Sequence, residues 1–187
     1  MFEELYALAI LYANGFDTGK RFQDVMNEMT LQGKEGILEL QYMPLKHAVI
    51  HTMFMADHGT AYDQDVFGAY LMRYLREQWY GKTLAFLGKH LYELWKQLPE
   101  SLQYELPFEL FLYADDEADF YSRTWITEAQ CRFWFEEVFN YYENGKKLTV
   151  GMNLSSQFHF VQKPATPLSK KRAAPKRRWF RKRKPKP

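Results

Sequence analysis

The sequence predicts a mainly α-helical protein: a compact bundle of five or six amphipathic helices, with room for one or two short strands, followed by a disordered basic C-terminal tail. Three observations carry this prediction. Apolar residues recur every three or four positions through most of residues 1–160. Hydrophobic residues make up 47% of the chain and aromatic residues 18%, more than disordered chains carry. After Glu143 there is no further acidic residue, and Lys, Arg and Pro dominate.

The length of 187 residues fits one folded domain, which we place at residues 1–160, with the tail at residues 161–187. The single cysteine, Cys131, cannot form a disulfide within the chain, which is typical of a reducing compartment. The first residues are acidic where a signal peptide would be basic, and no uncharged apolar stretch is long enough to span a bilayer. We therefore expect an intracellular protein without a transmembrane segment, cytoplasmic, or nuclear in a host that has a nucleus.

Six segments carry a helical pattern, and most are bounded by residues that start or stop helices. Thr127 followed by Gln130 is a capping box, Asp63 or Asp65 can cap another helix, and Pro44 suits the first turn of a third. The expected helices cover residues 2–14, from a cap at Asp17 or Thr18 to about 32, 44–57, 66–80, 84–98 and 127–143.

Two further segments are less regular. Residues 37–43 also fit a short strand, and residues 147–153 alternate weakly enough to add one strand or to cross the surface. Pro107 opens residues 108–121, which contain a cluster of acidic side chains between aromatic ones. That cluster lacks the glycine at the sixth position and the glutamate at the twelfth that a calcium-binding loop needs, so we predict no calcium site there.

The charges divide the chain into two opposite parts. Residues 1–143 hold 11 Lys and Arg against 23 Asp and Glu, a net charge of −12, whereas residues 144–187 hold 14 against 0, or +14. The acidic part could keep nucleic acid away from all but the tail, bind a basic protein or imitate the phosphates of DNA, or its charges could simply be the solvated faces of helices.

The tail has the composition of a phosphate-binding arm, because Lys and Arg neutralise backbone phosphates and release counterions without a folded surface. Two aromatic residues stand inside the densest basic cluster, where they could stack on unpaired bases, which favours single-stranded nucleic acid slightly over duplex. The predicted nucleic-acid-binding residues are Lys170, Lys171, Arg172, Lys176, Arg177, Arg178, Trp179, Phe180, Arg181, Lys182, Arg183 and Lys184.

Three alternatives use the same residues. A polybasic segment binds anionic membranes, with Trp179 and Phe180 at the headgroup level, and the protein would then be a membrane-surface adaptor. The basic runs at 170–172 and 176–178 also match the pattern of a nuclear import signal. Finally, the tail could fold back on the acidic body.

One constellation has the spacing of a metal site. His47 and His51 are four residues apart and would share one face of a helix, with Asp57 and His58 following. These four residues define the alternative of a metal-dependent hydrolase. The alternative is that the histidines have no chemical role and are packing or surface residues, since no catalytic glutamate lies between His47 and His51.

Other enzyme signatures are absent from the sequence, and Cys131 falls in an apolar helix stripe where a buried thiol is expected. We expect no cofactor. The tryptophans Trp79, Trp95, Trp125 and Trp134 favour a core, yet the aromatic surplus suggests an exposed partner or dimer surface. The sequence therefore predicts a non-catalytic accessory or regulatory protein whose body binds a protein partner or itself and whose tail binds nucleic acid without sequence specificity.

Overall fold

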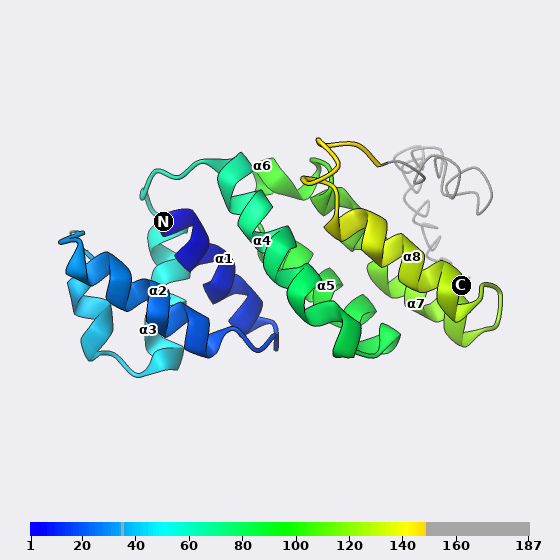
Figure 1. Cartoon of the computed structure of the whole chain (residues 1–187), viewed down its shortest axis with the longest axis horizontal. Helices are drawn as coiled ribbons and strands as arrows, with labels where there is room; N and C mark the ends of the chain where they lie inside the picture. The colour runs from blue at the N-terminus through cyan, green and yellow to red at the C-terminus, as the bar shows by residue number, and fades with distance from the viewer. Residues whose placement is uncertain (35, 149–187) are drawn as a thin grey trace, which may run out of the picture. The chain divides into compact units, whose positions relative to one another are not determined.

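The computed structural model describes residues 1–34 and 36–148, which form eight α-helices, three short 3-10 helices and no strand (Figure 1). The all-α prediction is confirmed. The bounds are α1 Phe2–Ala13, α2 Gly19–Leu31, η1 Leu38–Tyr42, α3 Leu45–Asp57, α4 Gln64–Gln78, η2 Trp79–Gly81, α5 Leu84–Gln97, α6 Glu100–Gln103, η3 Phe108–Tyr113, α7 Ala114–Ser122 and α8 Glu128–Phe139.

The structure differs from the expectation in three places. The described helices outnumber the predicted five or six, because α6 and α7 form between prolines and in the acidic segment, where the apolar pattern is short. The strand interpretation of residues 37–43 is wrong, since this segment forms the 3-10 helix η1. Residues 149–153, most of the other candidate strand, and the predicted tail lie outside the described residues.

Helix α1 is the hydrophobic centre of the bundle. The seven consecutive residues from Leu5 to Leu11 are each 0 or 1% exposed. This helix packs against α2, α3, α4 and α5, so it is enclosed around its circumference. Residues 5–11 carry no charge on any face, which suits this position because an unpaired charged side chain there would be costly to bury.

The other helices lie on the two sides of this centre. In Figure 1, α2 and α3 lie on the left of α1, α4 and α5 on its right, and α7 and α8 beyond them. Helix α5 packs closely against α7, because a Cβ atom on Gly88 would lie 2.8 Å from the Cβ of Ala118 and 2.9 Å from the carbonyl oxygen of Ala114. The absence of a side chain at Gly88 lets the two backbones approach.

Side-chain caps form at the starts of α4 and α8, as the sequence predicted. Thr127 and Gln130 form the predicted capping box, and Asp63 accepts hydrogen bonds from two backbone N–H groups of α4. Thr18, in contrast, stands at the N-cap of α2 but donates its hydroxyl to the Leu8 carbonyl at 2.8 Å. Thr18, one of the two predicted candidates, is therefore the N-cap residue, but its side chain connects the start of α2 to α1 and accepts no hydrogen bond from the helix.

Candidate interaction surfaces

The predicted nucleic-acid-binding residues, 170–172 and 176–184, lie outside the described residues. The structure therefore bears on the body of the protein.

Three of the four metal candidates lie on the predicted helix and the fourth follows it, but their side chains do not come together as a metal site. His47, His51 and Asp57 belong to α3 and His58 is its C-cap residue. The imidazole of His58 stacks on the Phe54 ring with centroids 3.8 Å apart, and its Nδ1 atom lies 3.0 Å from the Phe54 carbonyl oxygen. Across residues 1–34 and 36–148, no group of three or more His, Cys, Asp or Glu side chains is arranged to hold a metal ion.

Cys131 is buried in α8, as expected from its place in an apolar stripe. Its Sγ atom donates a weak hydrogen bond to the Glu117 carbonyl at 3.6 Å. Burial raises the pKa of the Cys131 thiol to about 12, with a further contribution from the negative charge of Glu117. The thiolate that a nucleophile needs is therefore disfavoured at this position.

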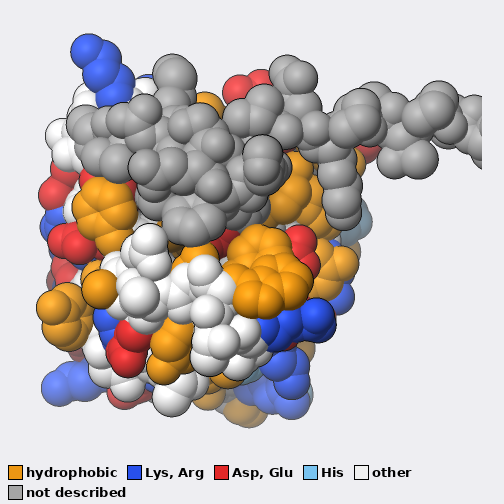
Figure 2. Space-filling view, turned by 90° about the vertical axis from the view of Figure 1, so that its right-hand side faces the viewer, with side chains coloured by type: hydrophobic (Ala, Val, Ile, Leu, Met, Phe, Trp, Pro, Cys, Tyr) orange, Lys and Arg blue, Asp and Glu red, His pale blue; other side chains and the backbone are white. Residues whose placement is uncertain are grey.

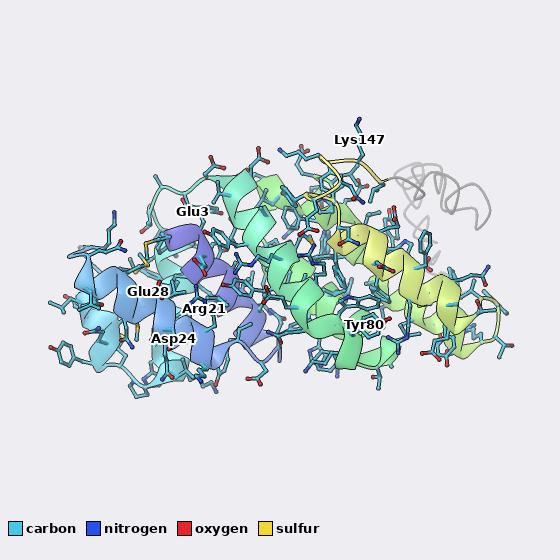
Figure 3. The ribbon with its side chains drawn as sticks, viewed as in Figure 1. Glu3, Arg21, Asp24, Glu28, Tyr80 and Lys147 are labelled. Carbon is cyan, nitrogen blue, oxygen red and sulfur yellow. The ribbon has the colours of Figure 1, made fainter. Side chains whose placement is uncertain are left out.

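Many acidic side chains of the body are engaged in ion pairs. Glu4, which is almost fully buried, accepts hydrogen bonds from Tyr74 Oη at 2.5 Å and from Arg21 Nη2 at 2.8 Å, which joins α1, α2 and α4. Arg21 also lies 3.6 Å from Glu28 on its own helix (Figure 3). Exposed pairs such as that of Arg21 with Glu28 contribute little energy each, but they neutralise part of the acidic surface.

Glu117 is the exception within the acidic cluster. Its neighbours Asp115, Asp116 and Asp119 are exposed, whereas Glu117 points inward and is 2% exposed. Its Oε1 atom has no hydrogen-bond partner among the described residues. Burial, together with the charge of Asp116, raises the pKa of Glu117 to about 7. The sequence could not single this residue out, because the register of α7 against α8 decides which acid turns inward.

The tryptophans divide between core and surface. Trp79 and Trp134 are buried, and Trp95 is half-buried and donates its indole N–H to the Gln103 carbonyl. Trp125, which precedes α8, is 66% exposed and stacks on Phe120. Figure 2 views this end of the body, where hydrophobic side chains lie interspersed with acidic and basic ones. The expectation of a mainly buried set with some aromatic residues left exposed is confirmed.

A cleft of about 400 Å³ lies between the start of α4, the α6–η3 region and the segment after α8. Its lining is mixed, with Asp65, Glu105 and Lys146 beside Phe108 and Tyr141. Asp65 and Lys146 form an ion pair with each other at 2.6 Å. Because Asp65 and Lys146 neutralise each other, neither is available as a general acid or base in this cleft.

A further exposed apolar surface lies on α3 and η1. Ile50 and Phe54 of α3 are 54% and 52% exposed, and Leu38 and Tyr42 of η1 are 54% and 83% exposed. The two elements contact each other. Large apolar side chains gathered on neighbouring elements are typical of an interaction surface. The sequence showed an aromatic surplus but not where it would be exposed.

Comparison of the chain with protein-family models, curated proteins and solved structures gives no match. In the described part of the chain, none of the helices combines the length and the apolar character needed to cross a membrane.

Proposed function

We propose that this protein is a non-catalytic accessory or regulatory factor: its helical body binds a protein partner or a second copy of itself, and its basic tail binds nucleic acid without sequence specificity. The observation that carries the proposal is the division of charge, −12 over residues 1–143 and +14 over residues 144–187. An acidic body repels nucleic acid, so attachment falls to the tail.

Features of the body support an interaction role. The face formed by Ile50, Phe54 and η1 presents apolar side chains to solvent. Cys131 is buried with its pKa raised, and the carboxylate of Glu4 is held between Arg21 and Tyr74. These reactive side chains are used in packing and in a structural network, whereas the exposed apolar face is left without a partner among the described residues.

The tail is tested by comparing the full chain with a version that ends at Gln162, titrating single-stranded and duplex nucleic acid at several salt concentrations. If about half of the twelve Lys and Arg residues after Gln162 engage phosphates, log K falls against log salt with a slope of roughly −4 to −5. The truncated chain shows no such binding. Equal binding by both versions would contradict the proposal.

A matched variant separates stacking from charge. Replacing Trp179 and Phe180 by Ala leaves every positive charge in place, so the salt slope stays the same while binding to single strands weakens more than binding to duplex. Anionic vesicles serve as the second probe. Binding to vesicles without binding to nucleic acid would replace the proposal by the membrane-surface alternative.

A further inference from the structure

The outer face of α3 has a pattern of side chains that fits a copy of itself. Successive residues of a helix are separated by about 100° around the axis, which places Lys46, Ile50, Phe54 and Asp57 within about 80° of one another. The buried residues of α3, which are Ala48, Val49 and Thr52, lie on the opposite side, toward α1. We call the first four residues the α3 outer stripe.

The middle of the stripe is apolar and its ends are charged. Ile50 and Phe54 are each about half exposed, and exposed apolar residues of η1 extend the surface beside them. Lys46 stands in the first turn and Asp57 at the last residue of the helix, and both side chains reach solvent. The order of the stripe along the chain is therefore positive, apolar, apolar, negative.

The two charges are placed against the preference of an isolated helix. A helix carries partial positive charge at its N-terminus and partial negative charge at its C-terminus, so acids are favourable at the start and bases at the end. Lys46 and Asp57 reverse that order. Within the described part of the chain, no ion pair involves either residue. Within one copy the charge of Asp57 acts on the nearby hydroxyls of Tyr6 and Tyr62, whose pKa it helps to raise, but no described cation of the same copy pairs with it.

We propose that two copies of the chain associate through their α3 outer stripes, which lie antiparallel about a two-fold axis level with His51 and Thr52. In that register Lys46 faces Asp57 of the second copy, and Ile50 faces Phe54 of the second copy, each pair occurring twice. Each charge also lies beside the end of the other helix that carries the opposite partial charge. The arrangement that is unfavourable in one copy becomes favourable in the pair.

A second copy fits this surface better than an unrelated partner. When two stripes lie antiparallel, the positive end of each faces the negative end of the other and the apolar centres meet. An unrelated acidic or basic helix would match only one end of it, whereas the antiparallel copy matches both ends and the apolar centre. The inference deepens the part of the proposed function that concerns the body and rests on it, and it does not depend on the tail.

The test measures the mass of the full chain across a dilution series by sedimentation equilibrium, without nucleic acid. The wild-type chain dimerises. Lys46→Asp and Asp57→Lys each weaken the dimer roughly tenfold or more, because each replaces two attractive contacts by two repulsive ones. The double variant Lys46→Asp/Asp57→Lys recovers most of the lost affinity, because both charge pairs re-form although the interactions with the helix ends are reversed. Lys89→Asp, an exposed reversal on α5, leaves the dissociation constant unchanged.

Either single reversal places a favourable charge at its own helix end, so loss of the dimer cannot come from unfolding of α3. A wild-type chain that is monomeric over the whole series overturns the inference. So does a dimer that tolerates both single reversals, or single losses that the double variant fails to reverse. Binding of the same variants to nucleic acid reports on the tail separately, so failure of the dimer and failure of the proposed function are distinguishable.

Discussion

Helices α1 and α3 have similar lengths and apolar sequences but opposite surroundings. Helix α1 is enclosed by four other helices and buries every residue from Leu5 to Leu11, whereas α3 contacts only α1 and η1 extensively and leaves Ile50 and Phe54 half exposed. The hydrophobic residues of α1 are thus explained by the fold of one chain. Those on the outer side of α3 are not, which is why we assign them to association.

The largest expected effect tests the difference between the two helices directly. Leu8→Ala in α1 removes fully buried methyl groups and leaves a cavity, so it lowers the free energy of unfolding by about 2 to 5 kcal/mol. Ile50→Ala in α3, measured by urea denaturation at concentrations below the dimer dissociation constant, lowers it by less than about 1 kcal/mol. Equal losses in the two variants would contradict the distinction between core and outer face.

A substitution at Glu117 measures how much a buried carboxyl without a hydrogen-bond partner at Oε1 lowers the free energy of unfolding. Because burial raises its pKa from 4.5 to about 7, the folded state prefers the protonated acid. The stability from this group is fully present below pH 4.5 and is lost as the pH rises to about 7. At pH 8, Glu117→Gln therefore raises the free energy of unfolding by up to about 3 kcal/mol.

The measurement is a set of urea denaturations between pH 4 and pH 8, in which the Glu117→Gln variant loses the pH-dependent step attributed to this carboxyl. Asp116→Asn is the matched control, because it removes a neighbouring charge and leaves the buried acid in place. It shifts the step to lower pH without abolishing it. An unchanged step in the Glu117→Gln variant would show that another group titrates.

The contact of α5 with α7 provides a smaller effect. A methyl group added at Gly88 meets Ala118 and the backbone of Ala114, and backbone atoms cannot turn aside, so Gly88→Ala lowers the free energy of unfolding by about 1 to 3 kcal/mol. Gly81→Ala, where nothing lies within 4 Å of the added carbon, changes it by less than about 0.5 kcal/mol. Thermal denaturation of the two variants side by side checks this.

The smallest expected effect concerns the charge at the start of α3. In the monomer, Lys46→Asp places an acid in the first turn and raises the free energy of unfolding by about 0.3 to 1 kcal/mol, while the same change weakens the dimer. Urea denaturation at concentrations below the dimer dissociation constant measures the first effect. A loss of monomer stability would mean that Lys46 has a favourable contact in its own chain.

Local signals in the sequence predicted where helices begin, and tertiary contacts decided the rest. Thr127 with Gln130 marked the start of α8, and Pro44 marked that of α3. That α1 would be enclosed on all sides did not follow from its periodicity, because spacing shows which residues share a face and not how many faces are covered. The inward turn of Glu117 depends in the same way on how α7 packs.

The candidate interaction face was only partly predictable. The sequence indicated an aromatic surplus and a partner or dimer surface, but residues 44–57 are apolar on several sides, so the outer stripe emerges only when the side toward α1 is known. The metal interpretation of the same helix came from the spacing of His47 and His51 alone. Spacing placed both histidines on the helix, yet the described residues supply no converging third ligand.

The most direct test of the central claim, that body and tail do separate work, compares the full chain with the version ending at Gln162 by sedimentation, alone and with a single-stranded oligonucleotide. We expect the truncated chain to dimerise as the full chain does and to leave the oligonucleotide free, and the full chain to carry it in a salt-sensitive complex. A truncated chain that still carries the oligonucleotide, or that no longer dimerises, would contradict the account.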